Sequence, residues 1–220
     1  MALLQIDDTT RRDHWFLPED CSCWYTGDYT ARGGFGCSPT NDLISNFKKS
    51  VTRRGRPEYR WKEDAIARIG RAFRDAFRPD AYRQVTFVPI PPSKARAHPE
   101  HDDRMTLALA HMARLVRAEL GIEADVRELV VQRQSYEASH TATTRARPED
   151  LIALYAIDET ISQPAPQQIL IVDDVLTTGS HFVAMRQVLE ARFPGVWIGG
   201  LFVARRKLAD DADDFDTDGD

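Results

Sequence analysis

The chain has 220 residues, of which 42% are hydrophobic and 29% are charged. This length suits one α/β domain with an added lobe and allows a sizeable core. The apolar runs are strand-sized, far short of the roughly 18 residues of a transmembrane helix, and no basic-then-apolar leader precedes Gln5. We therefore expect a cytoplasmic protein with no membrane contact.

The formal net charge of −5 arises at the end of the chain. Residues 209–220 contain seven aspartates, a single aromatic residue and no Lys or Arg, so the rest of the chain is close to neutral. A block of like charge with so few apolar residues predicts a disordered acidic tail. It would act either as an interaction tail or as a solubilising end.

Residues 1–60 are rich in aromatic side chains and contain all three cysteines. They end in a basic run that consists of Lys48, Lys49, Arg53, Arg54, Arg56 and Arg60. This run fits either a nucleic-acid patch or a solvated loop between lobes. Because the body of the chain is close to neutral and no recognised binding motif is present, a nucleic-acid partner is the less favoured interpretation.

The middle of the chain alternates between helical and strand patterns. Apolar residues at helical spacing predict a helix over 61–77, and Val-Thr-Phe-Val predicts a strand within 84–90. A second helix is expected to start at Asp102 or Asp103 and to stop at Gly121.

The second half of the chain continues this alternation. Further strands are expected at 126–131, 151–157 and 195–203, with a helix at 182–192 and a long loop or hairpin at 132–150. The order of the elements favours an α/β fold with a twisted, mostly parallel sheet flanked by helices and joined by right-handed crossovers.

The most informative stretch is Ile169–His181, which reads Ile-Leu-Ile-Val-Asp-Asp-Val-Leu-Thr-Thr-Gly-Ser-His. Its four leading apolar residues predict a strand that is covered on both faces. Asp173 and Asp174 follow at the carboxyl end of the strand, where ligands bind in open α/β sheets. The turn into the next helix offers backbone N–H groups and hydroxyls that suit an anion; it consists of Thr177, Thr178, Gly179 and Ser180.

A plain strand-to-helix connection is the alternative interpretation, with Thr177 or Ser180 serving only as the helix cap. Capping and anion binding use the same N–H groups, so the turn alone decides little. The two adjacent carboxylates favour a ligand site, because like charges side by side are costly unless cations or hydroxyl groups lie between them.

The stretch closely resembles the thirteen-residue phosphoribosyl diphosphate (PRPP) signature of type I phosphoribosyltransferases. The resemblance implies the fold of that family, with Asp173 and Asp174 facing the ribose 2′ and 3′ hydroxyls, often through Mg²⁺. The turn from Thr177 to Ser180 would hold the 5′-phosphate. His181 departs from the pattern, since several branches have Thr at this place. It would donate to a phosphate, cap the helix or face solvent.

A second part of the site is expected in the loop Val88–Arg96, which leaves a strand and presents two cations. By the resemblance this loop would hold pyrophosphate in a turn that often contains a cis peptide bond, and proline lowers the cost of a cis bond to about 0.5–1 kcal/mol. The residues concerned are Pro91, Pro92, Ser93, Lys94 and Arg96. A proline-rich loop with solvated cations is the alternative.

A long stretch without an apolar pattern lies between residues 132 and 150. Long structureless loops in compact domains are usually functional, and this one looks like the catalytic flexible loop of the family. Closure of such a loop would exclude water and bring positive charge to the departing pyrophosphate. The candidates are Arg133, His140, Arg145 and Arg147. Of these, Arg133 is placed among the catalytic residues with Lys94, Asp173 and Asp174.

Between about Cys21 and Arg205 the pattern is most similar to the ComF-type branch of the family. It has a cysteine-bearing N-terminal segment, a Phe-Lys-Lys stretch, Val-Pro-Ile-Pro, an Arg-rich loop and the signature. Only the signature is a specific match.

ComF-like proteins usually carry two Cys-x-x-Cys pairs, whereas this chain has only Cys21, Cys23 and Cys37. A tetrahedral structural zinc site needs four ligands, so another residue would have to complete it. The available fourth ligands are Asp20, Asp28 and His14. Zinc and free or buried thiols remain as alternatives, of which we favour the thiols, and a disulfide is not expected in the cytoplasm.

The resemblance divides the chain into an N-terminal hood lobe (1–60) that would recognise the acceptor, a phosphoribosyltransferase core (61–208) and the acidic tail (209–220). The implied reaction transfers ribose 5-phosphate from PRPP to a base or nucleotide acceptor, with Mg²⁺ as cofactor and release of pyrophosphate. The rival hypothesis is a regulator or effector that binds PRPP or a nucleotide and transfers nothing. We also expect a homodimer.

Overall fold

The computed structural model describes residues 3–133 and 147–208. In this part of the chain seven strands form one sheet, namely β1 (Leu4–Gln5), β2 (Cys23–Tyr25), β3 (Asp28–Thr30), β4 (Val85–Pro89), β5 (Asp125–Val126), β8 (Gln168–Leu176) and β9 (Trp197–Lys207). Their spatial order is β1-β2-β9-β8-β4-β5, and β3 also pairs with β9. β1 is antiparallel to β2, and all other pairs in this sheet are parallel. The prediction of an α/β fold with a mostly parallel sheet is confirmed.

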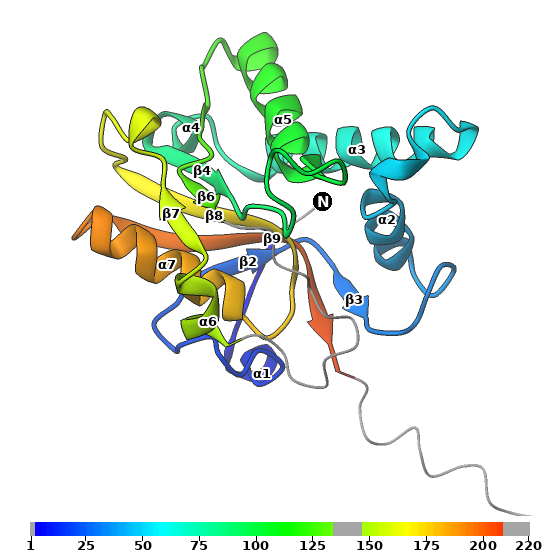
Figure 1. Cartoon of the computed structure of the whole chain (residues 1–220), viewed down its shortest axis with the longest axis horizontal. Helices are drawn as coiled ribbons and strands as arrows, with labels where there is room; N and C mark the ends of the chain where they lie inside the picture. Colours follow the sequence, from blue (N-terminus) through cyan, green and yellow to red (C-terminus); the bar gives the residue numbers. More distant parts are fainter. Residues whose placement is uncertain (1–2, 134–146, 209–220) are drawn as a thin grey trace, which may run out of the picture.

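Helices cover both faces of this sheet (Figure 1). One face carries α2 (Pro39–Phe47), α3 (Arg60–Ala76) and α5 (Arg104–Leu120), and the other carries α6 (Pro148–Ile152) and α7 (Ser180–Arg192). The two-stranded antiparallel sheet of β6 (Val130–Gln132) and β7 (Tyr155–Ile157) lies beside α7. The shorter elements are α1 (Asp8–Arg11), α4 (Ala81–Gln84), η1 (Val51–Arg53), η2 (Pro57–Tyr59) and η3 (Glu159–Ile161). Within the described residues no helix is both long and apolar enough to cross a membrane.

The apolar run of β8 places its side chains alternately in two core layers, because successive residues of a strand point to opposite faces. Ile169 and Ile171 pack in the layer under α7, and Leu170 and Val172 pack in the layer under α3 and α5. All four are at most 3% exposed. The strand is therefore covered on both faces, as its unbroken apolar sequence predicts.

The helices α3 and α5 approach each other closely at Gly70. A Cβ atom at this position would lie 2.7 Å from the backbone oxygen of Ala108. α5 ends at Gly121, which has a φ of +66° and serves as the left-handed C-cap. Both predicted helices are thus confirmed within one or two residues of their expected bounds.

Three strand predictions need correction. The strand expected at 151–157 exists only as Tyr155–Ile157, because Pro148 opens a short helix that continues to Ile152. The strand expected at 126–131 is divided between β5 and β6, which belong to different sheets. β8 extends through both signature acids to Leu176, because β9 continues to pair with it there.

Residues 1–60 belong to the same sheet as the rest of the chain. β2 pairs with residues 200–202 of β9, and β3 pairs with residues 205–207. The α2 residues Leu43, Ile44 and Phe47 are at most 3% exposed and pack in the core with α3 and α5. The segment expected to form a hood lobe therefore supplies three strands and part of the core.

Candidate functional site

The two signature acids lie just beyond the end of β4. β4 pairs with β8 up to Val172, whose carbonyl oxygen accepts a hydrogen bond of 2.9 Å from the Ile90 amide. From Asp173 onward β9 is the neighbour that still pairs with β8. The chain that leaves β4 therefore turns away beside the two carboxylates, at the carboxyl edge where parallel sheets bind ligands.

The side chains of Asp173 and Asp174 point to opposite faces of β8, because successive side chains of a strand alternate between its two faces. Asp173 continues the side of Ile171 and α7, and it interacts electrostatically with the Tyr155 hydroxyl. Asp174 continues the side of Val172 and contacts α5. The two carboxylates therefore have separate surroundings.

Asp174 is held by two cations of the chain itself. Lys48 Nζ lies 2.8 Å from Oδ1, and Arg104 contacts Oδ2 through Nη2 at 2.7 Å and through Nε at 3.2 Å. The Asp174 side chain is only 7% exposed, and these contacts replace the solvation that burial removes. Burial alone would raise the pKa of Asp174, but the charges of Lys48 and Arg104 outweigh it and lower the pKa to about 2. Asp174 is therefore ionised at neutral pH.

Arg104 is fixed in turn by a second acid, Asp102. Arg104 Nη1 and Lys62 Nζ each lie 2.8 Å from Asp102 Oδ2. Lys62 is 1% exposed, and its ammonium group also donates to the carbonyl oxygens of Phe47 at 3.0 Å and Lys49 at 2.8 Å. The Phe47 ring centroid lies 5.6 Å from the guanidinium carbon of Arg104. This chain of charges joins the starts of α3 and α5 to the end of α2 and to the site.

Asp173 has no such counter-ion among the described residues. Its Oδ1 accepts a hydrogen bond of 2.7 Å from the backbone N–H of Asp174. Burial and the neighbouring Asp174 charge raise the pKa of Asp173 to about 7. Adjacent acids with pKa values shifted in opposite directions are common at functional sites. Asp173 is thus the acid that an incoming cation would stabilise.

The turn after β8 packs against the N-terminal segment 14–17. The Phe16 N–H donates to the carbonyl oxygen of Thr178 at 3.0 Å, and His14 Nδ1 hydrogen-bonds to the carbonyl oxygen of Thr177. Gly179 has a φ of +88°, and a Cβ there would lie 3.2 Å from the backbone nitrogen of Leu17. The N-terminal segment therefore fixes the shape of the turn.

The N-terminus of α7 follows this turn directly. Its N-cap is Gly179, and no side chain makes a capping hydrogen bond to this described helix. The Thr178 hydroxyl donates to the Ser180 hydroxyl at 3.1 Å and accepts a long hydrogen bond of 3.4 Å from the Ser180 N–H. Capping by Thr177 or Ser180 is thus absent here, and a helix N-terminus favours an anion.

His181 hydrogen-bonds to a residue of β7. Its Nδ1 lies 2.8 Å from the Tyr155 hydroxyl, and the residue is exposed. His181 does not cap α7, which is one of the three roles that the sequence leaves open for it. Its hydrogen bond to Tyr155 is a contact that the sequence does not predict. This pair lies on the side of β8 that Asp173 follows.

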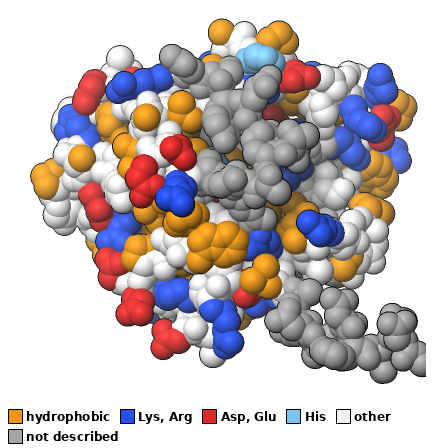
Figure 2. Space-filling view, turned by 60° about the horizontal axis from the view of Figure 1, so that its bottom comes forward, with side chains coloured by type: hydrophobic (Ala, Val, Ile, Leu, Met, Phe, Trp, Pro, Cys, Tyr) orange, Lys and Arg blue, Asp and Glu red, His pale blue; other side chains and the backbone are white. Residues whose placement is uncertain are grey.

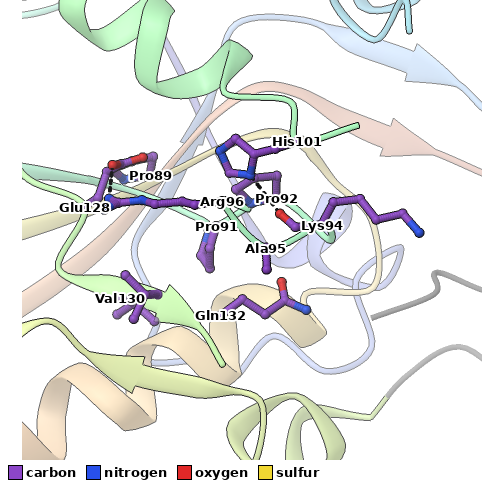
Figure 3. A pocket seen from close by; sticks show the side chains of 11 residues that line it. Pro89, Pro91, Pro92, Lys94, Ala95, Arg96, His101, Glu128, Val130 and Gln132 are labelled. Carbon is purple, nitrogen blue, oxygen red and sulfur yellow. Dashed lines mark hydrogen bonds and ion pairs between the residues drawn. The ribbon is translucent and has the colours of Figure 1, made fainter. Parts of the chain in front are cut away.

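The loop after β4 forms one wall of a pocket of about 120 Å³, together with His101, Glu128 and residues 130–132 (Figure 3). Arg96 forms an ion pair with Glu128 in this pocket, and His101 Nδ1 lies 2.8 Å from the carbonyl oxygen of Lys94. The Lys94 side chain extends away from Glu128. Arg96 is therefore paired with an acid although its side chain is 59% exposed, so the alternative of a proline-rich loop with solvated cations stays a prediction as well.

The cis peptide bond expected in this loop is absent. The bonds before Pro91 and Pro92 are trans, and the cis bond in the described chain is Gln163–Pro164. The loop is held instead by the bonds of Ile90 to β8 and of His101 to the Lys94 carbonyl oxygen.

Two of the flexible-loop candidates lie at the borders of the stretch 134–146. Arg133 is exposed, and its N–H donates to the carbonyl oxygen of Leu154 at 2.9 Å. Arg147 is exposed and precedes α6. Within the part of the chain that the structure describes, neither side chain pairs with the signature acids. His140 and Arg145 lie outside the described residues, as does the acidic tail.

The three cysteines do not lie together at one place. Cys21 and Cys23 are buried at β2, with Cys21 Sγ 2.5 Å from Arg186 Nη1, whereas Cys37 is exposed beside Gly33. Burial raises the pKa of both buried thiols. Across the described ranges, no three His, Cys, Asp or Glu side chains form a group able to hold a metal ion. Zinc and free thiols both stay predictions for these cysteines.

The basic run of residues 48–60 has several partners within the chain. Lys48 binds Asp174, Arg53 lies 3.6 Å from Glu58, and the Arg60 guanidinium lies 4.7 Å from the Trp61 ring centroid. On the face in Figure 2, the described Lys and Arg side chains are interspersed with Asp and Glu rather than forming one continuous basic surface. The nucleic-acid interpretation stays a prediction.

Sequence reasoning does not find Lys48, Arg104 or Lys62 as members of this site. Lys48 belongs to the Phe-Lys-Lys stretch, and the other two stand at ordinary helix starts. Arg104 meets Asp174 across 70 residues of sequence. Only the packing of α2 and α5 on the carboxyl edge of β8 brings these side chains together.

Comparison of the sequence with models of known protein families gave no match, and comparison with curated proteins gave none either.

Proposed function

We propose that the chain is a PRPP-dependent phosphoribosyltransferase of type I, which transfers ribose 5-phosphate to a nitrogenous acceptor. The observation that carries this proposal is the position of Asp173 and Asp174. They stand near the carboxyl end of a central parallel strand, which ends at Leu176 and leads into a tight turn and a helix N-terminus, and they lie beside the loop that leaves β4. These features suit the ribose, the 5′-phosphate and the pyrophosphate of one ligand.

The residues would divide the ligand between them. The turn from Thr177 to Ser180 and the first N–H groups of α7 would bind the 5′-phosphate, and Asp173 would accept hydrogen bonds from the ribose hydroxyls. Lys94 and the arginines that border the stretch 134–146 would neutralise the pyrophosphate. Asp174 would also face the sugar, with its charge balanced by Lys48 and Arg104 in the free protein.

In the reaction, a nitrogen atom of the acceptor forms a bond to the anomeric carbon while the bond from that carbon to pyrophosphate breaks. The sugar acquires positive charge on the way, which the carboxylates would stabilise more strongly than the neutral ground state. Cations around pyrophosphate would stabilise the charge that develops on the leaving group. The acceptor and its general base remain unassigned.

The carboxylate oxygens of Asp173 and Asp174 are of the kind that Mg²⁺ binds, but only those of Asp173 are without a counter-ion among the described residues. Mg²⁺ prefers oxygen ligands and is usually held by one or two carboxylates together with substrate phosphates, where it neutralises charge on the leaving group. Asp173 offers a carboxylate without a counter-ion among the described residues. Asp174 offers one whose two oxygens already contact Lys48 and Arg104. Asp173 would therefore be the first ligand.

One observation favours the second candidate, a regulator that binds PRPP and transfers nothing. The ion pairs of Asp174 satisfy its charge without any ligand. An acid neutralised in this way contributes to the fold even where no chemistry takes place.

The test measures pyrophosphate released from PRPP and Mg²⁺ with a panel of bases and nucleotides. We expect release by the parent with one acceptor and a loss of at least about 100-fold, roughly 2.7 kcal/mol of transition-state stabilisation, in Asp173→Asn with Asp174→Asn. Asp125→Asn is the matched control, because Asp125 is also ion-paired, with Arg127, but lies beside Thr86 near the start of β4. PRPP binding without pyrophosphate release across the panel would favour the regulator.

A further inference from the structure

The two cations on Asp174 are held very differently. Arg104 is anchored a second time by Asp102 and lies against the Phe47 ring. The Lys48 side chain is 44% exposed and forms its ion pair with Asp174. An exposed lysine on a flexible stem leaves an ion pair much more readily than an anchored arginine.

The backbone around Lys48 is fixed even though its side chain is exposed. The buried ammonium group of Lys62 binds the carbonyl oxygens of Phe47 and Lys49, the residues on either side of Lys48. Movement at this position is therefore confined to the side chain, whose tip can pivot about a fixed point at the mouth of the site.

We propose that Lys48 is an exchangeable counter-ion, which neutralises Asp174 in the free protein and leaves it when a divalent cation and a diphosphate ligand bind. The ammonium group then contacts a phosphate oxygen of that ligand. This inference rests on the proposed function, because it assumes that the diphosphate is PRPP.

The charges around Asp174 give the physical reason for exchange. Lys48 and Arg104 both bind the Asp174 carboxylate, and Asp102 balances part of the Arg104 charge. A divalent cation beside Asp173 would be repelled by both, and the repulsion falls when Lys48 moves away. A diphosphate brings negative charge to the same place, and a lysine ammonium group is a compact point charge that suits phosphate. Arg104 stays on Asp174 throughout.

Lys49 provides a matched control for Lys48. It carries the same charge at the next position, but its Nζ binds Asn46 Oδ1 at 3.1 Å and the carbonyl oxygen of Glu58 at 3.2 Å. It therefore does not compete for Asp174. Lys48→Arg is the second variant, because an arginine keeps the charge and binds a carboxylate more firmly.

The first measurement is binding of Mn²⁺ alone, followed by electron paramagnetic resonance. We expect Lys48→Met to bind Mn²⁺ about two- to five-fold more tightly than the parent, the range for loss of one partly exposed ion pair. Lys48→Arg should bind it no more tightly than the parent, and Lys49→Met should match the parent. Thermal denaturation shows whether each variant is folded.

The second measurement is binding of PRPP with Mg²⁺, followed by calorimetry. Here the order reverses, because the lysine now binds the ligand: Lys48→Met should bind PRPP at least about five-fold more weakly, and Lys49→Met should match the parent. This opposite pair of effects distinguishes exchange from a purely structural role, which would weaken both ligands.

Equal or weaker Mn²⁺ binding by folded Lys48→Met than by the parent would overturn the exchange. Unchanged PRPP binding by the same variant would overturn the contact with phosphate. A parent protein that binds no PRPP in the presence of Mg²⁺ would count against the proposed function, while the Mn²⁺ series would still decide whether Lys48 and a divalent cation exclude each other.

Discussion

Asp173 and Asp174 carry the same carboxyl group but have different charge states because their neighbours differ. Asp174 faces Lys48 and Arg104, so its pKa is lowered, and Asp173 faces burial and the Asp174 charge, so its pKa is raised. A bound cation would lower the pKa of Asp173 by giving it the counter-ion that Asp174 already has. Single residues at this site are therefore tuned by partners from distant elements.

His14 leads to a prediction about pH and stability. The residue is 0% exposed, Nδ1 binds the carbonyl oxygen of Thr177, and Nε2 has no hydrogen-bond partner among the described residues. Burial lowers the pKa of His14, against the opposing effects of the Thr177 bond and Asp13, and Arg205 and Arg206 lower it further. Protonation of this ring is therefore unfavourable in the folded protein.

As the pH is lowered, the histidine of the unfolded chain binds a proton at a pH of about 6.5, whereas His14 of the folded protein binds one only at a lower pH. The free energy of unfolding should therefore fall as the pH is lowered through the window between 6.5 and the lowered folded pKa. His14→Gln should make urea-unfolding free energies between pH 5 and 7.5 depend less on pH. His111→Gln is the comparison, since the pKa of His111 is lowered too. If His14→Gln keeps the full pH slope of the parent, His14 is not the titrating group.

At the scale of elements, the β8–α7 turn depends on contact with the segment 14–17 as well as on its own residues. Gly179 provides the positive φ that the turn requires and leaves room for Leu17. The proposed phosphate-binding turn is therefore shaped by a segment more than 160 residues earlier in the chain, whose hydrogen bond from His14 spans 163 positions.

Gly179→Ala should lower the free energy of unfolding by about 1–3 kcal/mol, because it combines a strained φ with a close approach to Leu17. Gly121→Ala is the matched control: its φ is +66°, but nothing lies within 4 Å of the added Cβ. The control should lose about 1 kcal/mol or less. Chemical denaturation gives these values. In a phosphate titration, Gly179→Ala alone should bind phosphate more weakly than the parent. Equal losses in both variants with unchanged phosphate binding would contradict this account of the turn.

At the scale of the whole molecule, the N-terminal residues complete the sheet. β9 pairs with β8 on one side and with β2 and β3 on the other, and α2 fills the core between α3 and the sheet. A boundary at residue 60 therefore separates two parts of one folded unit, and the acceptor-binding role of the first part remains a proposal.

A fragment that starts at residue 61 should not fold cooperatively, since it exposes one side of β9 and the core around α3. Far-ultraviolet circular dichroism with urea should show a gradual loss of signal in place of one transition. A chain that ends at Leu208 is the control and should unfold like the parent, because it keeps all the described strands. A sharp transition at the parent's midpoint in the 61–220 fragment would instead support an independent core.

The sequence by itself determined the elements whose signals are local. The apolar run of β8, the acids after it, the turn at Gly179 and the helical spacing of α3 all depend on neighbouring residues, so periodicity and turn chemistry are enough to predict them. The same locality explains the errors at 126–131 and 151–157, where short apolar stretches fit several structures and tertiary pairing decides between them.

Only the tertiary structure decided which side chains meet at the carboxyl edge of β8. Lys48 and Arg104 come from helices that are packed against the sheet, and no spacing rule connects them with Asp174. The pairing of β2 and β3 with β9 joins the two ends of the chain in the same way. Such contacts depend on how complete elements pack, and for this reason the sequence predicts two acids at this edge and the structure determines their charge.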